Sequence, residues 1–146
     1  ILLSGCISNG RDIASAIQMG ADLAYMGTRF INTKESMAEE GYKEMIINSK
    51  ASDIVYTAAV SGVEANFLKP SLEAMGITEE MWSKKAKMDF GKEMDTEAKA
   101  WKTIWSAGQG VTSIKDSPSS KDLIDSLKEE FTSSINKQTE MLKKYS

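Results

Sequence analysis

Histidine is absent from this chain of 146 residues, which also has only one cysteine and two prolines. A reaction that needs an imidazole base must therefore take it from outside these residues. A single cysteine excludes an internal disulfide and fits a reducing compartment, so we expect a cytoplasmic location. No apolar run approaches the length of a membrane span, and no membrane contact is expected.

The charge balance excludes a second group of functions. Eighteen Lys and Arg residues face twenty-one Asp and Glu residues, which leaves a net charge of -3. A chain of this charge has no general attraction to nucleic acid or to an anionic membrane surface. The sequence also holds no cluster of metal-ligand residues, so no metal site is predicted. Its length suffices for one ordinary domain with its own core.

Two glycine-containing turns are the most informative feature that is present. Residues 4–10 follow the apolar run 1–3, and residues 26–30 follow the apolar run 23–25. Residues 11–19 between them have helical periodicity, and Gly20 is a typical stop signal. The pattern predicts a strand, a helix and a parallel second strand. Because such crossovers are right-handed, both turns should emerge at the same edge of the sheet.

These turns have the composition of a phosphate-binding site. Gly5 and Gly27 would let a ligand approach the main chain closely, and N–H groups at the next helix start would attract an anion. Thr28 is placed to donate its hydroxyl proton to a phosphate, although it could instead cap the segment that follows. One such turn would indicate only a change of chain direction. Two turns in register favour phosphate binding.

The rest of the chain predicts mainly helices. Asn32 or Thr33 would cap the first of these, and Ser119 with Asp122 resembles a capping box for the last. Trp101 and Trp105 would share one helical face and pack in a core. The expected segments are a helix over about 34–48, a strand over 53–60, a short helix over 68–75, a Lys-, Glu- and Met-rich helical excursion over 78–102, a glycine-rich turn over 106–110 and a final helix from 119.

This pattern divides the chain into three parts. Residues 1–60 would hold the parallel strands and the phosphate turns, 61–97 a helical excursion or lid, and 98–146 the closing helices. Two strands alone do not make a stable parallel sheet, because its edges and faces need cover. We therefore expect the chain to be part of a longer polypeptide whose N-terminal part is missing.

A family resemblance adds to this interpretation. Residues 4–30 run Ser-Gly-Cys-Ile-Ser-Asn-Gly through to Met-Gly-Thr-Arg-Phe, and Trp-Ser-Ala-Gly-Gln occupies 105–109. These stretches resemble the C-terminal half of the nitronate monooxygenases, formerly called 2-nitropropane dioxygenases. The resemblance implies an α/β fold, namely the C-terminal part of a TIM (β/α)8 barrel with an additional helical region. It also implies FMN as cofactor, with its phosphate on the loops after the seventh and eighth strands.

Carried over by position, the resemblance assigns the site residues. Ser4, Gly5 and Cys6 would form the first phosphate turn, and Gly27 with Thr28 the second. The family usually has two glycines where this chain has Gly5 and Cys6. The catalytic histidine of the family belongs to the earlier half, so no catalytic residue is predicted here.

Two side chains near these turns allow more than one interpretation. Cys6 could be a redox-active thiol at a helix start, but a small filler residue is the preferred interpretation. Arg29 could bind phosphate, but alternation along the strand end directs it away from Thr28. A salt bridge beneath the barrel rim is therefore expected for Arg29.

The function implied by the resemblance is the oxidation of alkyl nitronates by FMN and dioxygen, which releases nitrite and a carbonyl compound. This chain would be the FMN-phosphate-binding half, inactive without the missing N-terminal half of the same polypeptide. One alternative is a flavin-dependent enoyl-acyl-carrier-protein reductase, which has closely similar phosphate turns. Another, of a different class, is a non-catalytic barrel that binds a phosphorylated ligand.

Overall fold

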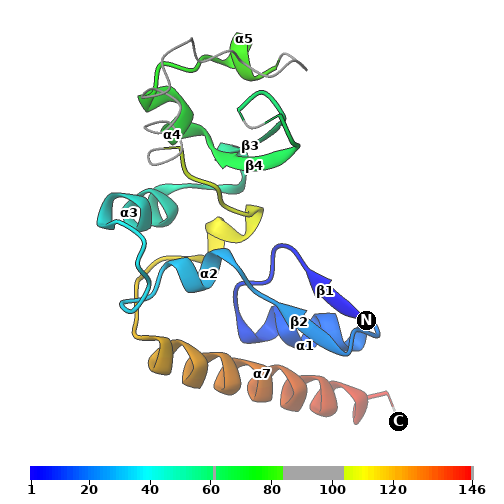
Figure 1. Cartoon of the computed structure of the whole chain (residues 1–146). Helices are drawn as coiled ribbons and strands as arrows, with labels where there is room; N and C mark the ends of the chain where they lie inside the picture. The colour runs from blue at the N-terminus through cyan, green and yellow to red at the C-terminus, as the bar shows by residue number, and fades with distance from the viewer. Residues whose placement is uncertain (61, 84–103, 146) are drawn as a thin grey trace.

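The computed structural model describes residues 1–60, 62–83 and 104–145 (Figure 1). Figure 1 shows β1, α1, β2 and α7 at one end of an elongated molecule and β3, β4, α4 and α5 at the other, with α2 and α3 between. The elements are β1 Leu2–Ser4, α1 Gly10–Gln18, β2 Leu23–Tyr25, α2 Thr28–Ile31, α3 Glu40–Asn48, the 3-10 turn η1 Ala51–Asp53, β3 Ile54–Thr57, β4 Ala65–Leu68, α4 Lys69–Ala74, α5 Glu79–Trp82, the 3-10 turn η2 Gln109–Ser113 and α7 Ser120–Leu142.

The predicted strand–helix–strand unit is confirmed. β1 and β2 are parallel, with Leu3 opposite Ala24, and α1 connects them. Asn9 caps α1 by accepting a hydrogen bond from the Asp12 N–H, as its short polar side chain favours. A small core of Ile7, Ala16 and Ala21 joins α1 to one face of the two strands.

The other half of the molecule contains a hairpin that the sequence analysis did not predict. The strand expected over 53–60 is confirmed as β3, but it pairs antiparallel with β4, so that Val55 lies opposite Phe67. The helix expected over 68–75 begins one residue later, as α4. Burial explains the arrangement, because Phe67, Leu72 and Trp82 lie in one apolar cluster beneath the hairpin.

The helix expected over 34–48 is wrong in its first third. Residues 34–39 are not helical, and α3 begins at Glu40. Neither expected cap acts there: the Thr33 hydroxyl donates to the Phe30 carbonyl, and the buried Asn32 amide donates to the Lys43 carbonyl. The Lys34 N–H donates to the carbonyl of Pro118 at 2.9 Å. These contacts hold the segment against a distant part of the chain, with a turn at residues 34–35 where the helix was expected.

The final helix is confirmed with its predicted cap. The Asp122 N–H donates to the Ser119 hydroxyl at 3.1 Å, and α7 continues to Leu142. α7 packs against α1 (Figure 1). A Cβ atom on Gly10 would overlap the main chain of α7 at Leu127 and Phe131, so only glycine permits this approach. Most of the helical excursion expected over 78–102, including Trp101, lies outside the described residues.

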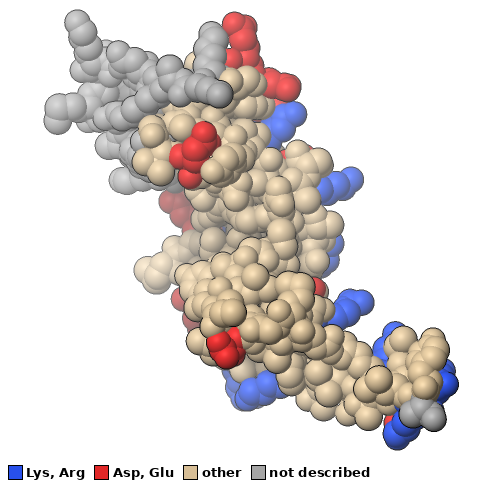
Figure 2. Space-filling view, turned by 90° about the vertical axis from the view of Figure 1, so that its right-hand side faces the viewer, with Lys and Arg blue, Asp and Glu red and all other residues tan. Residues whose placement is uncertain are grey.

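The described helices include none that is long and apolar enough to cross a membrane. Across the same residues, no three metal-ligand side chains gather to hold an ion. Figure 2 shows Lys and Arg side chains along the right-hand edge and at the lower end of this face.

Candidate functional site

Three glycine-containing turns meet at the carboxyl ends of β1 and β2. The first follows β1, the second links β2 to α2, and the third, residues 106–110, runs into the start of η2. They enclose a cavity of about 170 Å³, and all five predicted site residues line it. Its lining consists of Ser4, Gly5, Cys6, Ile7, Ser8, Tyr25, Gly27, Thr28, Gly108 and Gly110.

The first turn is tightly wound. Gly5 has φ +101° and Cys6 has φ +57°, so two successive residues take left-handed conformations. This conformation suits glycine but costs a residue with a side chain about 1–2 kcal/mol. The Cys6 thiol lies 3.9 Å from Oε1 of Gln109, in the third turn. Cys6 is exposed, so this contact does not bury the thiol, and the interpretation of Cys6 as a filler residue stays a prediction.

The second turn presents open space and a hydroxyl. No atom lies within 4 Å of the position that a Cβ on Gly27 would take. The Thr28 hydroxyl oxygen accepts a hydrogen bond from the Gly108 N–H at 2.8 Å. Because this bond uses an oxygen lone pair, the hydroxyl proton remains available to donate. In the part of the chain that the structure describes, the main-chain N–H groups of Cys6 and Thr28 have no intramolecular acceptor.

The third turn is the part of the site that sequence reasoning missed. Composition predicted a turn over 106–110, but nothing local showed that it meets residues a hundred positions earlier. The Ser8 hydroxyl donates to the Gly110 carbonyl at 3.0 Å, and a Cβ on Gly110 would overlap that hydroxyl. Gly110 therefore permits the first and third turns to close on each other.

Aromatic packing anchors the third turn. The ring of Tyr42 stacks on Trp105, with 5.1 Å between centroids, and its hydroxyl donates to the Ser106 carbonyl. Burial raises the pKa of Tyr42, so the phenol stays protonated as a donor. Trp105 was expected on a helix, but it lies outside the described helices and precedes an isolated bridge between Ser106 and Phe67.

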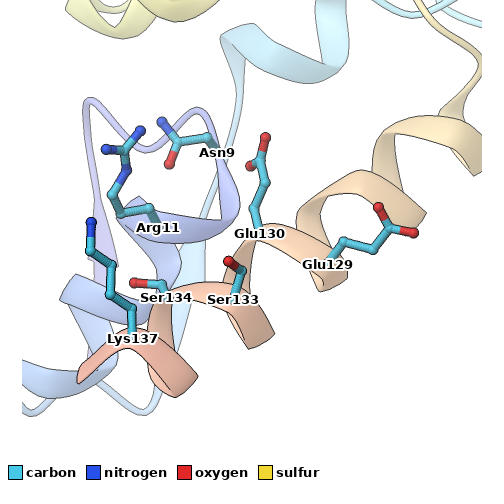
Figure 3. Close-up of a pocket in the computed structure, with 7 residues that line it drawn as sticks. All are labelled: Asn9, Arg11, Glu129, Glu130, Ser133, Ser134 and Lys137. Carbon is cyan, nitrogen blue, oxygen red and sulfur yellow. The ribbon is translucent and has the colours of Figure 1, made fainter. Parts of the chain in front are cut away.

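The start of α1 does not offer the free N–H groups that the sequence predicted. The Gly10 N–H donates to Oε2 of Glu130 at 2.6 Å, and the Asp12 N–H donates to Oδ1 of Asn9. Figure 3 shows Glu130 reaching from α7 toward this end of α1, beside a groove that Arg11 and Lys137 also line. Because a carboxylate already occupies the helix start, an anion in the cavity must use the turns instead.

Arg29 makes the predicted salt bridge. Its guanidinium donates to Oδ1 of Asp116 at 2.8 Å and to the Asp116 carbonyl at 3.1 Å. Arg29 is buried, and it is not among the residues that line the cavity. It is thus committed to a neighbouring segment and does not face the site.

A second hollow of about 380 Å³ adjoins the cavity and shares Gly27, Thr28 and Gly108 with it. Ile31 and Ala107 line this hollow with apolar surface, together with Ala65 and Asn66 of β4. The site therefore offers a small cavity among glycine turns and, next to it, a larger and more apolar space. A phosphate ester with a bulky organic part matches this shape.

The chain is similar to known proteins over most of its length. A family model described as "Nitronate monooxygenase" matches residues 1–130. The nitronate monooxygenase of Paraburkholderia phytofirmans is 30% identical over 143 residues, which cover 92% of this chain and 38% of that protein. The chain thus spans well under half the length of this relative.

Two solved structures resemble the fold. FabK from Thermotoga maritima matches with a TM-score of 0.72 and 25% identity, over 96% of this chain and 46% of that one. The nitroalkane oxidase of Streptomyces ansochromogenes matches with a TM-score of 0.69 and 23% identity, over 94% of this chain and 40% of that one. The second likeness concerns the fold alone.

Proposed function

Because the chain belongs to the nitronate monooxygenase family, we propose that its three turns hold the phosphate of FMN. Ser4, Gly5 and Cys6 form the first wall, and Gly27 with Thr28 the second. The third turn adds Gly108 and Gly110, which the resemblance did not assign. The observation that carries the proposal is a cavity that combines an open glycine, Gly27, with a hydroxyl whose proton is free to donate, that of Thr28.

The residues present fit this group. A phosphate needs donors and close approach to the main chain, and the cavity is lined by Thr28, which carries a hydroxyl, and by Cys6 and Thr28, whose main-chain N–H groups have no acceptor among the described residues. No carboxylate lines the cavity, so nothing there repels an anion at short range. The adjoining hollow provides space for the rest of the cofactor.

The proposed reaction is the oxidation of an alkyl nitronate by dioxygen, with nitrite and a carbonyl compound as products. FMN supplies the redox chemistry when bound, and this chain binds and orients it. The catalytic histidine of the family would lie outside these residues, since the chain has no histidine. We further propose that β1 and β2 are neighbouring strands of a (β/α)8 barrel. Its phosphate site would then lie at the barrel's usual location, at the carboxyl ends of the strands.

Turnover by the intact protein that carries this chain tests the proposal. The FMN-loaded protein should consume dioxygen and release nitrite when propyl nitronate is added, without any nicotinamide cofactor. Reduction of the flavin by NADH or NADPH, together with no turnover of nitronate, would instead support an enoyl-acyl-carrier-protein reductase. A protein that purifies without flavin absorbance and binds none on reconstitution would support the non-catalytic barrel.

A further inference from the structure

Two distant segments of the chain run side by side at the candidate site. Residues 28–35 and 108–120 contact each other at successive points, and these points occur in the same order along both segments. The contacts are Thr28 with Gly108, Arg29 with Asp116, Asn32 with Ser117, Lys34 with Pro118, and Glu35 with Ser120. The second and third turns of the site therefore belong to one jointly held unit.

Arg29 forms the ion pair between these two segments. It follows Thr28 directly on α2, and only 9% of its surface is exposed. Its two hydrogen bonds reach both the side chain and the main chain of Asp116. A buried guanidinium is strongly destabilising without a partner, so Arg29 holds the segment after η2 in place.

The position of that segment affects the Thr28 hydroxyl. The Gly108 N–H bonds to the hydroxyl oxygen, so the hydroxyl proton must point elsewhere. If the third turn moved away, the hydroxyl could rotate and accept from water or from the ligand's surroundings. A fixed donor is what an acceptor-only phosphate requires.

We propose that Arg29 is a positioning residue for the phosphate site. By holding Asp116 through its hydrogen bonds, Arg29 keeps the Gly108 N–H bonded to the Thr28 hydroxyl oxygen. The hydroxyl proton of Thr28 then points into the cavity and can be donated to the phosphate. This inference rests on the proposed binding of FMN phosphate. It predicts an effect on the phosphate specifically, and not on the flavin ring.

Paired titrations with FMN and riboflavin test the inference, because riboflavin lacks only the phosphate. Asp116→Ala removes the carboxylate but keeps the main-chain carbonyl to which Arg29 also donates, so the buried guanidinium retains an acceptor and the intact protein should fold with reduced stability. We expect this variant to bind FMN about tenfold more weakly, and riboflavin within about twofold of the unmodified protein. Arg29→Lys should show a loss of the same kind, because a single ammonium cannot reproduce both contacts of the guanidinium. If Arg29→Lys does not fold, the FMN and riboflavin titrations of Asp116→Ala test the inference by themselves.

The matched control removes another ion pair. Lys121→Met eliminates the exposed contact of Lys121 with Asp125 on α7 and should change neither affinity. Unchanged FMN affinity in folded Asp116→Ala would overturn the inference. An equal loss for FMN and riboflavin would also overturn it, because it would show a general structural role. An unmodified protein that binds both flavins equally would overturn the proposed phosphate site and this inference with it.

Discussion

The two ends of the molecule differ in what they bury. The hairpin end has a core of large side chains, including Phe67, Leu72 and Trp82. The strand–helix–strand end buries Ile7 and small alanines, together with Leu123 and Leu127 of α7, and it leaves large apolar side chains of the two strands exposed in this chain. Yet the candidate site lies at this second end. The comparison shows that a binding geometry built from turns need not coincide with the best-packed part of a fold.

Contacts between residues far apart in the sequence stabilise the site end, whose own core is small. The close approach of Gly10 to α7 supports α1, and the third turn holds the first and second through Ser8 and Thr28. Small residues matter here because each contact brings main chain against main chain or against a short side chain. Substitutions that enlarge a side chain should therefore destabilise the site end, and substitutions that shorten a buried side chain should destabilise the hairpin end.

The largest expected effect is the loss of a core side chain at the hairpin end. Leu72 is fully buried, so Leu72→Ala should lower the free energy of unfolding by about 2–5 kcal/mol. The matched variant at the site end, Leu23→Ala, should cost less than about 0.5 kcal/mol in this chain by itself, where Leu23 is 62% exposed, and more in the intact protein, where the other strands of the proposed barrel would cover this face. Denaturant unfolding of both variants measures the difference. Equal costs would mean that the two ends do not differ in burial.

A single added methyl group at the site end should have the next largest effect. Gly10→Ala places a Cβ against the main chain of α7, and overpacking of this kind costs about 1–3 kcal/mol. Gly41→Ala is the control, because Gly41 lies within α3 and its Cβ would meet only the edge of the Trp105 ring at 3.4 Å. Thermal unfolding should show a lower midpoint for Gly10→Ala alone. An unchanged midpoint would contradict the close packing of α1 on α7.

The smallest effect is expected for Cys6→Gly. Glycine relieves the left-handed strain at φ +57° but adds entropy to the unfolded chain, so stability should change by less than about 1 kcal/mol. FMN affinity should be preserved or slightly improved, and turnover of propyl nitronate should persist. Loss of turnover with full flavin occupancy would show that the thiol takes part in the chemistry.

The same contrast explains how much the sequence could predict. β1, α1 and β2 were predictable because their signals are local: two apolar runs, a helical stripe and Gly20. β4 was not, because Ala65–Leu68 lacks β-branched residues and becomes a strand only by pairing with β3. Tertiary contacts also prevail over local pattern at residues 34–39, which form a turn and irregular chain in place of the expected helix.

The features of the candidate site also fall into those that local sequence could predict and those that it could not. The first two turns and the Arg29 salt bridge followed from spacing along short segments. The third turn was visible as a glycine-rich stretch, but its contact with Thr28 spans eighty residues and has no local signal. Glu130, which occupies the start of α1, is likewise one acidic residue among several on a long polar helix until the fold brings it to Gly10.

The central claim, that these turns hold a phosphate, is tested most directly by replacing Gly27. Its φ of -108° suits any residue, and a Cβ there meets no protein atom, so Gly27→Leu should obstruct only a ligand. Fluorescence titration of the intact protein should show FMN bound more tightly than riboflavin. In Gly27→Leu, FMN affinity should fall by at least about tenfold and the preference over riboflavin should largely disappear. An unchanged preference for FMN in the folded variant would contradict the phosphate assignment.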